Sequence, residues 1–156
     1  MVSDIQLALS AGLYMQPSRF LKPHSQIKVV PNPTARWAND QPLSVYYEIY
    51  NLILNNENET SYEVSYSIKM LHFEKSIFGV IGDFFKSKKT EPSVVSVTTK
   101  KGLSRTEREY LAFDISDLPP GEALLEIKVK DLQSSKESRA NVTFRIGKAQ
   151  KLSKSE

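Results

Sequence analysis

Strict alternation of apolar and polar residues dominates two neighbouring stretches of the sequence and restricts both to β-strands. In PLSVYYEIYNL (residues 42–52) and SYEVSYSIKM (residues 61–70), every second side chain is large and apolar. Because successive side chains of a strand point to opposite faces, each stretch has one apolar and one more polar face. The polar turn NNENET between them predicts an antiparallel hairpin. The apolar positions are Leu43, Val45, Tyr47 and Ile49, then Tyr62, Val64, Tyr66, Ile68 and Met70.

The same alternation recurs near the C-terminal end. EALLEIKVKD (residues 122–131) and RANVTFRI (residues 139–146) flank a polar turn and predict a second hairpin. Shorter strands are indicated at residues 26–31, 92–99 and 108–116. About seven strands with one face apolar and no long helix are typical of an all-β, immunoglobulin-like, two-sheet antiparallel sandwich.

The chain length suits a single domain of this class. The 156 residues are enough to bury a substantial core, and no internal repeat divides them. We expect an N-terminal arm or edge strand at residues 1–20, with the strand at residues 5–9. The sandwich domain is expected at residues 21–147 and a flexible tail at residues 148–156.

Composition excludes several function classes. Cysteine is absent, which excludes disulfides, thiolate metal ligands and cysteine nucleophiles. The net charge of +3 is small and does not favour a nucleic-acid partner. No apolar run approaches the ~18 residues of a membrane helix. The N-terminus, MVSDIQLALSAG, lacks the basic region of a signal peptide, so we expect no signal peptide within this sequence.

Read in order, several motifs resemble one bacterial family. SDIQLA, VVPNPTARW, PLSVYYEIYNL, YEVSYSI, YLAFDISDLPPGEALLEIKVKDL and VTFRI are similar to the β-sandwich module at the C-terminal end of GWxTD-domain proteins of Bacteroidetes and Chlorobi. The resemblance covers about Asp4 to Ile146. The Gly-Trp-x-Thr-Asp motif itself is absent, and the single tryptophan, Trp37, lies in TARWAND. The resemblance implies an extracytoplasmic envelope protein, periplasmic or associated with the outer membrane, and no catalytic residues; a cytoplasmic location is the alternative.

The sequence offers little that resembles a catalytic or metal site. His24 and His72 have no acidic or histidine partner at ligand spacing, and no phosphate loop, G-x-S-x-G elbow or H-E-x-x-H motif occurs. Asp114, Asp117 and Glu122 cluster around a proline turn and could supply calcium ligands, but the D-x-D-x-D-G pattern is missing. We favour turn capping by Asp117 and a solvated Glu122. We therefore expect no enzyme activity, no metal and no cofactor.

A tyrosine face is the clearest candidate contact surface. Tyr46 and Tyr50 flank Glu48 on the side of their strand opposite the expected core. A pair of tyrosines beside a carboxylate can stack on a sugar ring or anchor a protein partner. The alternative, which we favour, is that a neighbouring strand or the N-terminal arm covers the rings. Trp37 is a further candidate for the same surface.

The stretch SIFGVIGDFFKSKK (residues 76–89) interrupts the alternating strands. Its apolar residues recur at helical spacing, which predicts a short helical crossover near residues 76–86 that covers the sandwich. Two alternatives remain: a loop that binds a partner, and a membrane-surface segment in which Phe84 and Phe85 insert beside the following lysines.

Together these observations favour a non-catalytic interaction or accessory module of a bacterial envelope protein. The alternative is a carbohydrate-binding module that uses the tyrosine face. The partner is then an unknown protein or glycan, and the candidate contact residues are Trp37, Tyr46, Glu48, Tyr50, Phe84 and Phe85.

Overall fold

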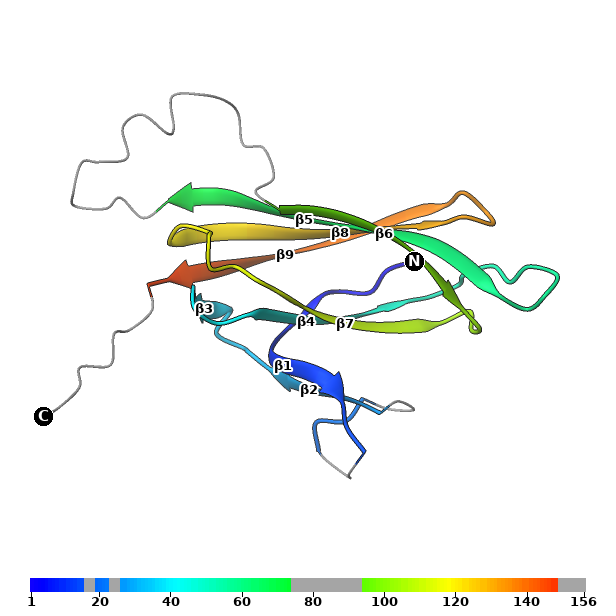
Figure 1. Ribbon diagram of the computed structural model, residues 1–156, viewed down its shortest axis with the longest axis horizontal. Coiled ribbons are helices and arrows are strands. Elements are labelled where there is room, and N and C mark those ends of the chain that lie inside the picture. The colour runs from blue at the N-terminus through cyan, green and yellow to red at the C-terminus, as the bar shows by residue number, and fades with distance from the viewer. Residues whose placement is uncertain (16–18, 23–25, 74–93, 149–156) are drawn as a thin grey trace, which may run out of the picture.

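The chain forms two β-sheets packed face to face (Figure 1). A computed structural model describes residues 1–15, 19–22, 26–73 and 94–148, and these residues contain no helix. The predicted all-β class and its sandwich-like arrangement of two sheets are therefore confirmed. The strands are β1 (Gln6–Leu13), β2 (Ile27–Pro31), β3 (Arg36–Ala38), β4 (Leu43–Ile49), β5 (Thr60–Phe73), β6 (Val94–Gly102), β7 (Glu107–Phe113), β8 (Gly121–Asp131) and β9 (Glu137–Gly147).

The two sheets have four and five strands. Their orders are β2-β1-β4-β7 and β3-β9-β8-β5-β6. Neighbouring strands are antiparallel, except that β3 runs parallel to β9. The predicted antiparallel sandwich of about seven strands is confirmed in part: the described residues form nine strands, mostly antiparallel. The parallel strand β3 was not predicted, because three residues are too few for alternation to reveal.

One of the two predicted hairpins is correct. β8 and β9 form the expected hairpin, with Ile127 opposite Ala140. The predicted hairpin between residues 43–50 and 62–70 is wrong, because β4 pairs with β1 and β7 while β5 pairs with β6 and β8 in the other sheet. The connection between them carries the buried Leu52, which anchors it in the core as it crosses from one sheet to the other.

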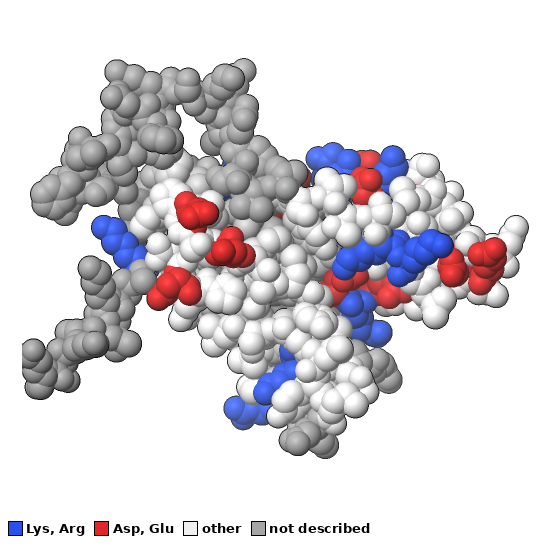
Figure 2. All heavy atoms as spheres, viewed as in Figure 1, with Lys and Arg blue, Asp and Glu red and all other residues white. Residues whose placement is uncertain are grey.

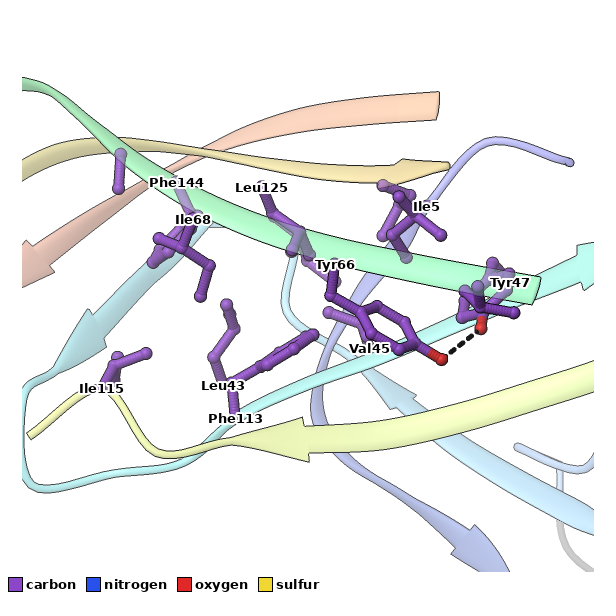
Figure 3. Packing of buried hydrophobic residues seen from close by; sticks show 14 of the residues in the cluster. Ile5, Leu43, Val45, Tyr47, Tyr66, Ile68, Phe113, Ile115, Leu125 and Phe144 are labelled. Carbon is purple, nitrogen blue, oxygen red and sulfur yellow. Dashed lines mark hydrogen bonds between the residues drawn. The ribbon is translucent and has the colours of Figure 1, made fainter. Parts of the chain in front are cut away.

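The core lies between the sheets and is built from alternate residues of each strand. Figure 3 shows side chains of β4 and β5 meeting across this space, with the hydroxyls of Tyr47 and Tyr66 2.8 Å apart. Trp37 also belongs to this core: it is 3% exposed and its ring packs edge-on against Phe144, with centroids 6.0 Å apart. Burial of a large apolar side chain contributes about 1.5–3 kcal/mol, so this layer supplies most of the stability of the fold.

A polar cluster ties the sheets together at the edge where β6 and β7 lie. Tyr62 on β5 and Lys100 on β6 are directly opposite each other, on the inward face. Both donate hydrogen bonds to Glu109 on β7 of the other sheet, at 2.7 Å from the phenol and 2.5 Å from the ammonium group. We call Tyr62, Lys100 and Glu109 the edge cluster. Charge-assisted bonds of this kind are short and directional, so they fix the spacing of the two sheets here.

A second, smaller apolar cluster lies on the outer face of the four-stranded sheet. It consists of Ala8, Ile27, Val29 and Tyr46. β1 pairs with β4 only at residues 6–8, and a register shift between Ala8 and Ser10 then redirects the strand. In Figure 1 the β1–β2 hairpin (blue) extends below the two layers. Its strand β2 thereby packs apolar side chains against Tyr46.

Two of the predicted features concern residues that the structure does not describe. The helical crossover predicted at residues 76–86 lies outside the described residues, as does all of the predicted tail except Lys148. No helix among the described residues is long and apolar enough to cross a lipid bilayer.

Candidate functional site

The outer face of β4 ends in a carboxylate held by two phenols. Tyr46 and Glu48 alternate with the inward-facing residues of β4, and Tyr50 follows the strand directly. The Tyr46 hydroxyl donates to Oε1 of Glu48 at 2.5 Å, and the Tyr50 hydroxyl donates to Oε2 at 2.7 Å. Both carboxylate oxygens are thus engaged before any ligand arrives, and the position of the Tyr50 ring is set by its hydrogen bond.

The N-terminal segment fixes the backbone of Glu48. The Ser3 N–H donates to the Glu48 carbonyl oxygen, and the Glu48 N–H donates to Ser3 Oγ, each at 2.8 Å. An isolated bridge between Val2 and Ile49 extends this pairing. Residues before β1 therefore lie along β4 and form one wall of the site.

Two basic side chains approach the Glu48 carboxylate, one from β7 and one from the segment between β1 and β2. Arg108 on β7 lies opposite Glu48, with Nε 3.9 Å from Oε1. Lys22 places its ammonium group 4.8 Å from the centroid of the Tyr46 ring and donates a hydrogen bond to Gln6 Oε1. The cations partly neutralise Glu48, and the cation–π contact holds Lys22 over the buried ring.

Glu48, the two tyrosines and Lys22 line a cleft of about 340 Å³. Its walls come from the N-terminal segment, β1, Lys22 and the end of β4. The lining residues are Ser3, Asp4, Ile5, Gln6, Lys22, Tyr46, Glu48 and Tyr50. We call this the tyrosine cleft. A depression of about 630 Å³ between the β1–β2 hairpin and the β6–β7 turn is larger, but its described lining contains no aromatic ring.

The pKa values of Glu48, Tyr46 and Tyr50 are shifted away from pH 7. Burial of Glu48 would raise its pKa, but the two phenol hydrogen bonds and the charges of Arg108 and Lys22 outweigh burial, so the pKa of this carboxyl group is lowered. Burial, followed by the hydrogen bond to Glu48, raises the pKa of Tyr46. The same type of hydrogen bond raises the pKa of Tyr50. At neutral pH the cleft therefore holds an ionised carboxylate and two neutral phenols.

The structure separates the sequence-predicted contact residues. Tyr46 is 3% exposed and covered by β2, whereas Tyr50 is 38% exposed. Trp37 lies in the core and not at this surface. Phe84 and Phe85 lie outside the described residues. Only Glu48 and Tyr50 thus combine a polar contact with access from solvent.

Sequence reasoning missed the cleft walls. Gln6 lies opposite Tyr46 and Arg108 opposite Glu48 across strand pairs that the sequence does not specify, and Lys22 comes from a loop. Alternation in residues 5–8 places Gln6 opposite the apolar face, which is the one local signal.

Acidic and basic side chains of the described residues are intermixed on one face of the molecule (Figure 2). On the face shown in Figure 2, acidic and basic side chains lie side by side over the right-hand half. Two of the three carboxylates considered for calcium have local partners: Asp114 Oδ1 accepts from the Ser116 N–H at 3.0 Å, and Glu122 Oε2 lies 3.1 Å from His72 Nδ1. Within the described ranges, no three His, Asp or Glu side chains gather at a spacing that would hold a metal ion.

Comparison with known proteins adds no assignment. No protein-family model matches the chain, and no curated protein sequence matches it with significance.

Proposed function

We propose that the chain is a non-catalytic recognition module and that the tyrosine cleft is its contact surface. The observation that carries the proposal is the geometry of the cleft, in which both oxygens of Glu48 already accept hydrogen bonds from Tyr46 and Tyr50. The directions of the pKa shifts agree with it. A general acid or base works best when its pKa lies near the operating pH. Glu48 is shifted to be a weaker base, and Tyr46 and Tyr50 are shifted to be weaker acids. These groups are arranged for hydrogen bonding rather than for proton transfer.

Preorganisation supports a role in binding. The Tyr50 ring is held by its hydrogen bond to Glu48, whose backbone is paired with Ser3. A ring already fixed in the free protein loses less conformational entropy on binding. Tyrosine at a surface offers a large apolar face together with a polar tip, which is why it is enriched where proteins meet.

A protein partner in the bacterial envelope is the role we favour. The support is the resemblance to the C-terminal module of GWxTD-domain proteins, carried by motifs such as PLSVYYEIYNL and LPPGEALLEIKVKD. That resemblance also supports an immunoglobulin-like classification of the sandwich and an extracytoplasmic location. The module then serves as an accessory or docking part of its protein.

Carbohydrate binding is the second candidate, favoured by the exposed Tyr50 ring beside an ionised carboxylate. Sugar platforms rely on exposed aromatic faces, and the burial of Tyr46 and Trp37 leaves Tyr50 as the one exposed ring of the three. A single ring gives a smaller stacking surface than the pair that the sequence suggested. For that reason a protein partner ranks first.

Site-specific photocrosslinking in source cells tests the proposal. A photoreactive benzoylphenylalanine replaces Tyr50 in one variant and Tyr110 in a matched control. Tyr110 is 37% exposed and lies on the outer face of the same sheet, outside the cleft. We expect a discrete protein adduct in the envelope fraction from position 50 and none from position 110. Equal adducts from both positions, or none from position 50, would contradict a protein-binding cleft.

A glycan array separates the second candidate from the first. Glycan binding by the purified chain that is lost in Tyr50→Ala but kept in Tyr110→Ala would favour the carbohydrate role. Turnover of any substrate that Glu48→Gln abolishes would instead overturn the non-catalytic assignment.

A further inference from the structure

β6 is the last strand of the five-stranded sheet and is unusually accessible. Within the described part of the chain it pairs with β5 and with no other strand. Residues 96–99 are exposed on both faces of the sheet, and Val97 is 58% exposed. The stretch Val94–Thr99 contains β-branched residues and one serine, with no charge and no proline. Such an edge is a template for a further strand.

The other sheet edges are covered, short or charged. The edge of β2 is covered by residues 20–22, because the Val29 N–H donates to the Phe20 carbonyl and Leu21 bridges to Lys28. β3 is three residues long and pairs only with residues 145–147 of β9, so residues 137–144 have no second strand partner in the described chain, but they begin with the charged Glu137 and Arg139. β7 carries the charged run Glu107–Glu109, and Glu109 points inward to the edge cluster. Short strands, covering segments and inward charges are the devices by which proteins block edge pairing.

Only part of β6 is free to take another strand. Lys100 is tied to Glu109 of the opposite sheet, so the C-terminal third of β6 is held against β7. Ser96 and Thr98 share the inward face with Lys100, yet they are exposed, so the four-stranded sheet does not cover this portion. Among the residues whose exposure is described, the open part of the edge is therefore 96–99.

We propose that β6 pairs antiparallel with β6 of a second copy of this chain, centred on Val97. The distribution of charge selects this orientation. Parallel pairing in register would place Lys100 and Lys101 of both copies side by side, and like charges opposite each other destabilise a sheet. Antiparallel pairing about Val97 places Lys101 of the two copies about 27 Å apart along the strands, at a rise of about 3.4 Å per residue. That distance is several times the Debye length of about 8 Å at physiological salt.

The same register pairs compatible side chains. Val97 lies opposite Val97 of the second copy, on the outer face. Ser96 lies opposite Thr98, and hydroxyl pairs of this kind stabilise neighbouring strands. The contact is self-complementary about a two-fold axis, so it closes at two copies and does not propagate into a fibre. The interface is separate from the tyrosine cleft and does not depend on the function proposed for it.

Sedimentation equilibrium over a range of concentrations tests the self-association. We expect a reversible monomer–dimer equilibrium for the native sequence. Val97→Lys places two like charges on the axis and should raise the dissociation constant at least ~10-fold, which corresponds to about 1.4 kcal/mol. Leu103→Lys is the matched control, because Leu103 is 80% exposed in the β6–β7 turn and introduces the same charge outside β6. A monomer at all concentrations, or equal weakening by both variants, would overturn the proposal.

Single-cysteine variants test the register independently, because the chain has no cysteine of its own. Under mild air oxidation, Val97→Cys should form a disulfide-linked dimer. Thr99→Cys alone should not, since its two copies would lie about 14 Å apart, beyond disulfide reach. A mixture of Ser96→Cys and Thr98→Cys should give the mixed dimer in excess of either homodimer. Equal crosslinking at positions 97 and 99, with unchanged far-ultraviolet circular dichroism, would exclude this pairing.

Discussion

β4 carries tyrosines on both faces, and the two sets have different roles. The inner tyrosines are Tyr47 of β4 with Tyr62 and Tyr66 of β5, and they lie between the sheets. The outer tyrosines are Tyr46 and Tyr50, and they share Glu48. Tyr46 and Tyr47 are adjacent in sequence and both are buried, but Tyr47 is covered by the opposite sheet and Tyr46 by β2 of its own sheet.

The comparison shows that the element packed against a tyrosine ring determines which group its hydroxyl can hydrogen-bond to. Inner hydroxyls bond across the core, Tyr47 with Tyr66 and Tyr62 with Glu109, so they hold the two layers in one relative position. Outer hydroxyls converge on one carboxylate within a single sheet and leave the Tyr50 ring accessible. The inner set is thus structural, and the outer set forms the candidate contact surface.

Truncation of a ring should reveal the largest contrast between the two sets. Tyr47→Ala removes a fully buried aromatic side chain and leaves Tyr66 without its hydroxyl partner, so we expect a loss of about 3–5 kcal/mol in the free energy of unfolding. Tyr50→Ala should change it by no more than about 0.5 kcal/mol, because the ring is exposed at the end of its strand. Urea titration followed by tryptophan fluorescence measures both, since Trp37 is in the core. Similar losses for the two variants would contradict the division of roles.

The carboxylates Glu109 of the inner set and Glu48 of the outer set allow a second comparison. Removal of Glu109 should lower the free energy of unfolding more than removal of Glu48, with a smaller difference than for the rings. Glu109→Ala leaves the Tyr62 hydroxyl and the Lys100 ammonium group without their acceptor between the sheets, and we expect a loss of about 1–3 kcal/mol. Glu48→Ala should cost less, because the Tyr50 hydroxyl can turn to water. The same urea titrations compare them. A larger loss for Glu48→Ala would show that the cleft, rather than the edge cluster, holds the fold together.

Alkaline pH should act through the buried tyrosines, which are the three inner ones and Tyr46, and much less through the exposed Tyr50. Burial raises the pKa of Tyr47 and Tyr66, and burial followed by the hydrogen bond to Glu109 raises the pKa of Tyr62. Above about pH 10 the unfolded chain releases these protons while the folded chain retains them. The unfolded state then binds fewer protons, so the free energy of unfolding falls as pH rises, by up to about 1.4 kcal/mol per pH unit for each such tyrosine.

The variant Tyr62→Phe separates this effect from general alkaline denaturation. Thermal melts between pH 9 and about pH 11 should show a shallower decline for Tyr62→Phe than for the native chain. Tyr50→Phe should leave the decline almost unchanged, because water screens an exposed phenol. Parallel declines in all three proteins would indicate that the inner phenols do not govern alkaline stability.

Alternation in the sequence predicted which side chains share a face, but not which strands are neighbours. It placed Tyr47 and Tyr66 on apolar faces correctly and assigned the β8–β9 hairpin. It wrongly paired β4 with β5, because a period of two contains no information on whether two apolar faces lie side by side or meet across a core. The apolar residue Leu52, which is buried in the connection, was the feature of the sequence that argued against a simple polar hairpin turn.

The candidate site was predictable to a similar extent. The spacing of Tyr46, Glu48 and Tyr50 was enough to place all three on one side of the chain. The burial of Tyr46 depends on the bulge in β1 that brings β2 over it, and no local pattern specifies that bulge. The edge cluster was missed for the same reason: Glu109 meets its donors through contacts between sheets.

The parallel pairing of β3 with β9 has a consequence for folding during synthesis. Trp37 packs on Phe144 and pairs beside Ile146, near the opposite end of the described sequence. At a synthesis rate of about 5–20 residues per second, the indole emerges from the ribosome on the order of ten seconds before its partners. During that interval it is available to chaperones. The five-stranded sheet needs β9 between β3 and β8, so it should be completed only after β9 has been translated.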